Sequence, residues 1–169
     1  MSFEPDVLRL GRAFGVEVQA EYPRGARGVD TQAEHQVERG SGRAIWAKDG
    51  TKLEPLEARL GRLGRIDLLL EGLDEDSGLP FQVVLEIKRT NWDRQAKHRV
   101  APNVARHRLQ VWSYLEPLLE RVDVGEVAWV QGALVYPRRP RKAGRASDIE
   151  QRLGEYGLSV VWYDELAAP

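Results

Sequence analysis

The sequence predicts an α/β protein built on a mixed β-sheet with helices on both faces. Two apolar runs, "GRIDLLLEG" at 64–72 and "FQVVLEIKRT" at 81–90, are separated by the polar stretch "LDEDSGLP", which is typical of two antiparallel strands and their turn. Two later apolar runs each follow a segment with helical periodicity. The predicted order is helix, antiparallel strands, helix, strand, helix, strand, and a mixed sheet covered on both faces is the natural closure for it.

The first third of the chain is predicted to contain two helices and a hairpin. Apolar residues at near-helical spacing indicate a helix over 3–14. The stretch "TQAEHQVER" at 31–39 has a polar start and is followed by glycine, so we expect a short helix there. The dipeptide Asp49–Gly50 lies between strand-like flanks in 43–60 and predicts a hairpin.

The last third is predicted to alternate helices and strands. A helix is expected from Pro102 or Asn103 to about Glu120, although Pro117 lies inside it and proline ends or bends helices. The remaining elements are a strand at 126–137, a helix at 147–157 with Ser147 or Asp148 as its cap, and a last strand at 158–166.

Length and composition restrict the class of protein. A chain of 169 residues with 42% hydrophobic and 30% charged residues fits one globular domain over 1–169. No apolar stretch approaches the roughly 20 residues of a membrane helix, and the start "MSFEPDVLRL" does not resemble a signal peptide. The chain has no cysteine, which excludes disulfides, thiolate zinc sites and cysteine-ligated iron–sulfur clusters. We therefore expect no membrane association and a cytoplasmic protein, with export by a route that needs no signal peptide left open.

The net charge of −1 conceals two basic segments. The stretch from Arg89 to Arg108 holds six basic residues and the single acid Asp93, and "YPRRPRKAGR" at 136–145 holds five basic residues and no acid. Such segments present a basic surface to a polyanion even when the whole chain is neutral. The alternative is that they are solvated surface arginines without a partner.

The strand at 81–90 ends in an acid and a base of unusual placement. Glu86 and Lys88 project from the same face of an extended chain. With the turn centred on "DEDSG", Asp67 faces Glu86 across the antiparallel pair. Two carboxylates that meet require a cation, and oxygen ligands favour Mg²⁺ or Mn²⁺. The alternative is an exposed ion pair, with Leu85 and Ile87 facing the core instead.

Three short motifs resemble those of the PD-(D/E)XK nuclease superfamily, and within it the RecB-type nucleases. They are Gly64-Arg65-Ile66-Asp67, then Glu86-Ile87-Lys88, then the Gln-x-x-x-Tyr pattern of Gln110 and Tyr114. The resemblance covers roughly residues 55 to 120. It implies a restriction-endonuclease-like fold with a core in αβββαβ order, flanked by helices on both faces.

The resemblance also implies metal-dependent hydrolysis of a phosphodiester. Asp67, Glu86 and the backbone carbonyl of Ile87 would bind the metal, and Lys88 would position the attacking water. Gln110 and Tyr114 would lie one helical turn apart facing the site; for Tyr114, core packing is the alternative.

Relatives of this kind often carry a further acid or histidine upstream. Glu34, His35 and Glu57 are the candidates here, and the sequence does not choose between them. For His35, an exposed polar position is the favoured interpretation. His98 and His107 are expected at the surface without a catalytic role.

Contacts to nucleic acid are expected from the two basic segments and from the helix that carries Gln110. Trp92 has the alternative role of a packing residue that anchors its loop, which we favour, although it could stack on a base. The candidates are Arg89, Trp92, Arg94, Asn103, Arg106, Arg138, Arg139, Arg141 and Lys142.

The sequence thus predicts a metal-dependent deoxyribonuclease, with endonuclease and exonuclease action both open. No fused helicase or recognition domain is visible, so a delivery, recognition or inhibitor protein is an expected partner besides DNA, and a dimer is one option. The rival hypotheses are a catalytically inactive nucleic-acid-binding or protein-interaction module on the same fold, and an α/β scaffold whose charges are solvated.

Overall fold

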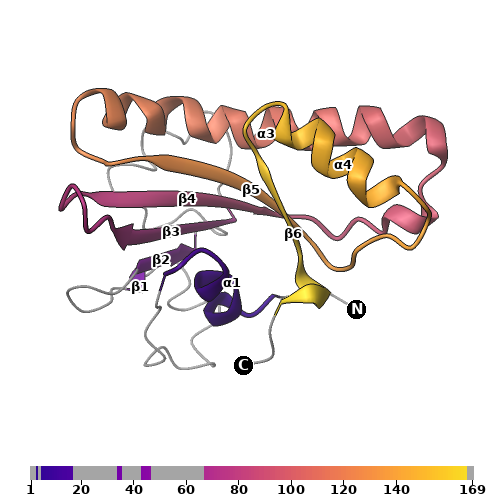
Figure 1. The fold of residues 1–169 in the computed structure, drawn as a ribbon, viewed down its shortest axis with the longest axis horizontal. Coiled ribbons are helices and arrows are strands. Elements are labelled where there is room, and N and C mark those ends of the chain that lie inside the picture. Colours follow the sequence, from indigo (N-terminus) through magenta and orange to yellow (C-terminus); the bar gives the residue numbers. More distant parts are fainter. Residues whose placement is uncertain (1–2, 4, 17–33, 36–42, 47–66, 167–169) are drawn as a thin grey trace.

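The chain folds around a six-stranded mixed sheet in the order β1-β2-β3-β4-β5-β6 (Figure 1). The computed structural model describes residue 3 and residues 5–16, 34–35, 43–46 and 67–166. The strands are β1 (Glu34–His35), β2 (Arg43–Trp46), β3 (Leu68–Leu73), β4 (Pro80–Ile87), β5 (Val130–Tyr136) and β6 (Ser159–Trp162). The helices are α1 (Val7–Ala13), α3 (Lys97–Asp123) and α4 (Arg145–Gly154). The predicted α/β class is confirmed.

Strand direction changes at β4. The strands β1 to β4 pair in antiparallel fashion, whereas β4, β5 and β6 run parallel. Parallel neighbours need a crossover, which α3 supplies between β4 and β5, and α4 between β5 and β6. The carboxyl ends of β4 and β5 therefore lie side by side at one end of the sheet.

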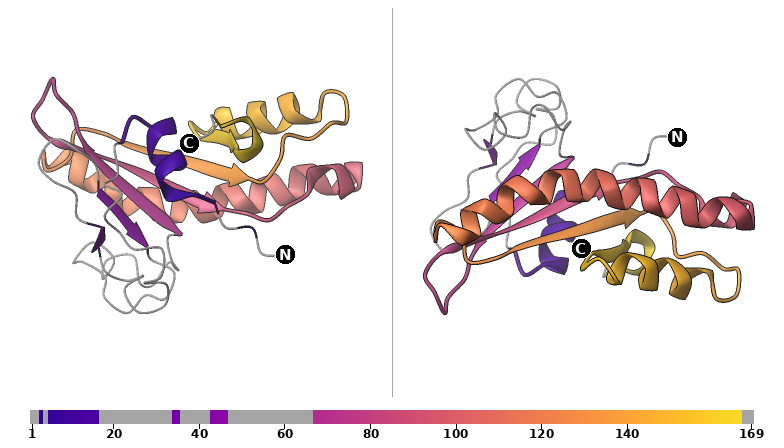
Figure 2. Two further views of the ribbon diagram at one scale, coloured as in Figure 1. Left: turned by 90° about the horizontal axis from the view of Figure 1, so that it is seen from below. Right: turned by 90° about the horizontal axis from the view of Figure 1, so that it is seen from above.

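The helices form a layer on each face of the sheet. In both views of Figure 2, α3 and α4 lie on one face and α1 crosses the other. Successive side chains of β4 point to opposite faces of the sheet and contribute to both cores. Val84 packs under α3, while Val83 and Leu85 pack toward α1. A strand buried on both faces reads as a continuous apolar run, as "FQVVLEI" does.

The long helix α3 begins earlier and ends later than its periodicity predicted. It spans Lys97–Asp123 and contains both Pro102 and Pro117, so the expected early end or start at a proline is wrong. Each proline removes one backbone donor. A row of buried side chains on the same helix packs against the sheet and offsets that loss: Val100, Val104, Val111, Tyr114, Leu115 and Leu118.

Two further expectations near chain turns are corrected. Instead of a helix over 31–39, Glu34 and His35 form β1, which pairs with β2; strand pairing outweighs the weak local helical pattern. The helix predicted over 147–157 begins at Arg145, after Gly144 with a φ of 75°, so neither Ser147 nor Asp148 is its cap. Of the hairpin predicted over 43–60, only the first strand is described, as β2; its turn at Asp49–Gly50 and its second strand lie outside the described residues.

A glycine in β5 allows the close approach of α3. A Cβ at Gly132 would lie 2.8 Å from side-chain atoms of Val111 and Leu115 and 2.9 Å from one of Leu158. We expect Gly132→Ala to lower the free energy of unfolding by about 1–3 kcal/mol, because three packed side chains must shift together. Gly154→Ala is the control: nothing lies within 4 Å of its Cβ, and the change should stabilise the helix by about 0.5–1 kcal/mol. Urea unfolding of both variants checks this; equal stabilities would contradict it.

Candidate active site

The pairing of β3 with β4 brings the two predicted carboxylates together. Leu68 pairs with Leu85, so the next position places Asp67 opposite Glu86 at the end of the ladder. An oxygen of Asp67 accepts a hydrogen bond from the backbone N–H of Ile87 at 2.8 Å. This contact fixes the carboxylate of Asp67 against the chain segment that carries Glu86 and Lys88.

Glu86 is buried, in contrast to the exposed pair that was the alternative. Only 3% of its surface is accessible, and it lies on the α3 side of β4, in line with the core residue Val84. The notion that Glu86 and Lys88 face bulk solvent is therefore wrong for Glu86. A buried carboxylate is costly unless its surroundings compensate for lost hydration.

A chain of polar contacts leads from Glu86 to α3. The Nζ of Lys88 lies 3.3 Å from Oε1 of Glu86 and donates a hydrogen bond to Oε1 of Gln110. The amide nitrogen of Gln110 lies 3.5 Å from the hydroxyl of Tyr114, one turn further along the helix. The structure thus brings together all five residues predicted to carry the site. Tyr114 is only 1% exposed, so it also packs in the core, as the alternative held.

The electrostatics of the site favour a protonated Glu86 in the absence of a cation. Burial raises the pKa of Glu86 to about 8, and repulsion from the Asp67 carboxylate adds to the rise, while Lys88 opposes it. Burial also raises the pKa of Tyr114, with Glu86 and Asp67 contributing. The tyrosine hydroxyl is accordingly a neutral hydrogen-bonding group at physiological pH.

The donor set fits a hard divalent cation. The Oε2 of Glu86 is buried and accepts no hydrogen bond from a donor among the described residues, although buried oxygens normally have a partner. The hydrogen bond between Glu86 and Asp67, which adds to the rise in the pKa of Glu86, requires a proton on one of the two acids. Together with the carboxylate of Asp67 and the peptide oxygen of Ile87, Oε2 of Glu86 would offer the oxygen ligands that Mg²⁺ and Mn²⁺ prefer. In the part of the chain that is described, no cluster of three acidic, histidine or cysteine side chains occurs.

Of the three candidates for a further ligand, the structure describes the backbone of Glu34 and His35. Glu34 and His35 form β1, and the register places Glu34 beside Ile45, which pairs in turn with Leu69. Their side chains are outside the described set, as is the whole of Glu57.

The predicted nucleic-acid contacts separate into exposed and structural residues. Trp92 is 1% exposed and packs in the core, which confirms its anchoring role. Asn103 donates its amide hydrogen bond to Gln95 at 2.9 Å. The exposed members are Arg89, Arg94, Arg106, Arg138, Arg139, Arg141 and Lys142.

One buried histidine was missed. His107 was expected at the surface but is 4% exposed, and its Nδ1 lies 2.9 Å from the hydroxyl of Tyr136. Burial lowers its pKa to about 4, with the charges of Lys88 and Arg106 acting in the same direction. Its spacing of three and seven residues from Gln110 and Tyr114 was the available signal, since it puts all three on one helical face. His98 is exposed as expected.

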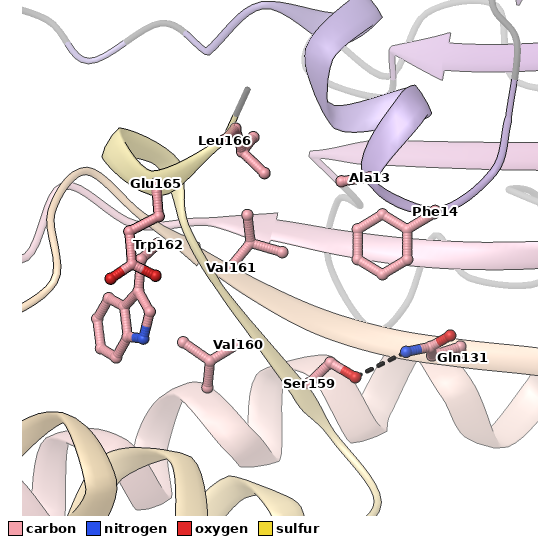
Figure 3. A pocket seen from close by; sticks show the side chains of 9 residues that line it. All are labelled: Ala13, Phe14, Gln131, Ser159, Val160, Val161, Trp162, Glu165 and Leu166. Atoms are coloured by element: carbon pink, nitrogen blue, oxygen red, sulfur yellow. Dashed lines mark hydrogen bonds between the residues drawn. The ribbon is translucent and has the colours of Figure 1, made fainter. Parts of the chain in front are cut away.

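A separate hollow of about 580 Å³ lies between α1 and β6 (Figure 3). Apolar side chains such as Phe14 and Val161 line much of it, and Gln131 donates a hydrogen bond to Ser159 at 2.7 Å at its rim. None of the predicted site residues lines it.

Comparison of the chain with protein-family models, with curated proteins and with solved structures finds no match. The site is therefore interpreted from its own geometry. Among the described residues, no helix combines the length and apolar character that crossing a membrane requires.

The buried His107 predicts a loss of stability in acid. Its pKa in the folded protein, about 4, is below the ordinary value of 6.5, so its contribution is fully present above pH 6.5 and is lost as pH falls toward 4. The loss is at most about 3 kcal/mol. In His107→Gln, which keeps a hydrogen-bonding group for Tyr136, this component should be absent. Urea unfolding of both proteins from pH 7 to pH 4 should show the stability difference shifting in favour of the variant; a constant difference would contradict the assignment.

Proposed function

We propose that this protein is a divalent-metal-dependent nuclease that hydrolyses DNA phosphodiester bonds, on a restriction-endonuclease-like fold. The observation that carries the proposal is the buried Glu86, with one oxygen that accepts no hydrogen bond from a donor among the described residues, placed opposite Asp67 and in contact with Lys88. A buried acid, an opposed acid and an ammonium at the end of a strand match the requirements of metal-assisted hydrolysis.

Asp67, Glu86 and the carbonyl of Ile87 are proposed to hold Mg²⁺ or Mn²⁺. When bound, the cation stabilises the negative charge that develops on the phosphate and favours ionisation of water. The residues supply two carboxyl groups and, 3.3 Å from Oε1 of Glu86, the ammonium of Lys88. Charged groups that are already held in position can stabilise the charge that develops in the transition state without a cost of reorganisation.

Lys88 is proposed to hold the attacking water. Its ammonium has three donors, of which Gln110 and Glu86 engage two in the structure. The third is left to orient a water or a phosphate oxygen. Gln110 acts as a positioning residue, because its carbonyl oxygen fixes the ammonium while its amide faces Tyr114.

The first prediction of this proposal concerns cleavage. We expect purified protein to cut supercoiled plasmid, linear duplex or single-stranded DNA with Mg²⁺ or Mn²⁺ and not with a chelator. Lys88→Ala and Asp67→Ala should reduce the rate at least about 100-fold, since the first removes the group that orients the water and the second removes a ligand of the metal. Gel assays on the three substrates measure this.

The control for cleavage is Arg152→Ala, which removes an exposed residue paired with Asp148 on α4 and should leave the rate unchanged. Salt-sensitive DNA binding without metal-dependent cutting would support the inactive binding module instead. Neither binding nor cutting would support the scaffold hypothesis.

The second prediction concerns Glu86 without metal. The pKa of Glu86 in the folded protein is about 8, whereas its ordinary value is 4.5. The stability that the bound proton contributes is therefore fully present below pH 4.5 and is lost as pH rises through 8. In EDTA at pH 8, Glu86→Gln should therefore be more stable than the parent by roughly 2–4 kcal/mol, and the difference should disappear toward pH 5.

Added Mg²⁺ should reverse that order. The melting temperature of the parent should rise with Mg²⁺ concentration, because a ligand that binds only the folded state stabilises it. The melting temperature of Glu86→Gln should not change. Differential scanning calorimetry with and without Mg²⁺ measures both effects. A variant less stable than the parent in EDTA at pH 8 would show that the carboxylate is compensated by something other than a cation.

A further inference from the structure

The two basic segments are joined into one rigid surface beyond the carboxyl ends of β4 and β5. The carboxylate of Asp93 accepts hydrogen bonds from the backbone N–H groups of Arg141 at 2.9 Å and Lys142 at 3.1 Å. In return, the guanidinium of Arg145 donates to the backbone oxygens of Trp92 at 2.7 Å and Gln95 at 2.9 Å. Segments about 50 residues apart in sequence are thus fixed side by side by two reciprocal contacts.

Some arginines of this surface are engaged by contacts within the protein, and others are not. Arg145 is structural, and Arg139 lies within 3.5 Å of the carboxylates of Glu150 and Glu165. Arg89 and Arg138 are exposed and have no ion pair with any described residue. They come from different segments and line the same pocket.

This pocket has a volume of about 280 Å³. That volume is just below the roughly 300–1,000 Å³ of small-molecule sites, so the pocket can receive one ring-sized group at a time. Besides the two arginines, the lining has an apolar part, formed by Phe3, Pro137 and Pro140 over the buried Trp92, and a polar part. The polar part consists of Thr90, Asn91 and Asp93, and the carboxylate of Asp93 is already held by the backbone N–H groups of Arg141 and Lys142. Two arginines beside a lining that is partly apolar and partly polar match a group that has an anionic end and a flat ring with hydrogen-bonding edges.

The pocket adjoins the candidate active site. Arg89 follows Lys88 directly, so their Cα atoms are about 3.8 Å apart. The ammonium of Lys88 contacts Gln110 of α3, whereas Arg89 lines the pocket together with Phe3, which packs against the core cluster on the α1 side. A nucleic-acid strand that crosses the end of β4 would contact both.

We propose that this basic pocket, lined by Arg89 and Arg138, binds one unpaired nucleotide next to the bond that is cut. The two guanidinium groups bind its phosphate, and the apolar part of the lining receives its base. Because a base within a duplex cannot enter so small a pocket without leaving its partner, single-stranded DNA or an unpaired end is the preferred substrate. This inference rests on the proposed nuclease function and names the substrate form that it takes.

The test measures binding separately from cleavage. A short fluorescent oligodeoxythymidylate and a duplex of equal length are titrated in EDTA over a range of KCl concentrations, and fluorescence anisotropy is recorded. The variants are Arg89→Ala/Arg138→Ala and the control Arg121→Ala/Arg152→Ala. The control makes the same change in net charge at one half-buried and one exposed arginine, neither of which lines the pocket. Thermal unfolding of both variants verifies that each is folded.

The parent should bind the single strand more tightly than the duplex. In the pocket variant, the slope of log K against log salt should become shallower by about 0.7, from the one phosphate that the two arginines neutralise, with a loss of roughly tenfold in affinity. The control should retain the parent's slope. The proposed nucleotide site would be wrong if the two variants had equal slopes of log K against log salt. It would also be wrong if the parent bound the duplex at least as tightly as the single strand.

Failure of this inference is distinguishable from failure of the nuclease. If the parent cuts DNA but the pocket variant binds and cuts as the control does, the nuclease stands and the pocket is wrong. If the pocket variant loses single-strand binding while no metal supports cutting by the parent, the pocket stands as a binding site and the nuclease is wrong.

Discussion

The burial of the Glu86 carboxylate is the constraint on which the arrangement of this end of the molecule depends. A carboxylate placed among core residues under α3 has to be neutralised, by a proton, by the ammonium of Lys88 or by a cation. The neighbouring Asp67 makes the proton less easily lost and a cation more strongly attracted. Without a cation the site therefore favours a protonated Glu86, and a bound cation would take the place of that proton.

The long helix α3 is the second part of that arrangement, because one of its faces supplies both core and site. Val111 and Leu118 on this face pack on the sheet, and Gln110 and Tyr114 reach the Lys88 end of β4. His107, one turn earlier, stays neutral between Tyr136 and the nearby cations. Packing of the helix therefore fixes the orientation of its polar side chains, which is how a reactive group is held in position.

The basic loops depend on backbone contacts instead of core packing. The pKa of Asp93 is lowered by the backbone N–H groups of Arg141 and Lys142 that donate to it, so it remains ionised and holds its loop partner over the whole physiological range. The guanidinium of Arg145 donates hydrogen bonds to the backbone oxygens of Trp92 and Gln95. Two of the ionised groups in this basic region thus serve to align the loops, and the exposed arginines that remain are presented by a fixed backbone at little cost in chain entropy.

The sequence by itself determined the α/β class, the antiparallel pair β3–β4 and its register, and hence the meeting of Asp67 with Glu86. These follow from local rules: the strand period of two and a short polar turn leave few ways to pair the chain. It did not determine that α3 runs through two prolines, that residues 34–35 form a strand, or that His107 is buried. It also gave no sign that Asp93 and Arg145 clamp two distant loops. Those outcomes depend on contacts between segments far apart in sequence, and burial against another element outweighs the small local preferences that a sequence pattern expresses.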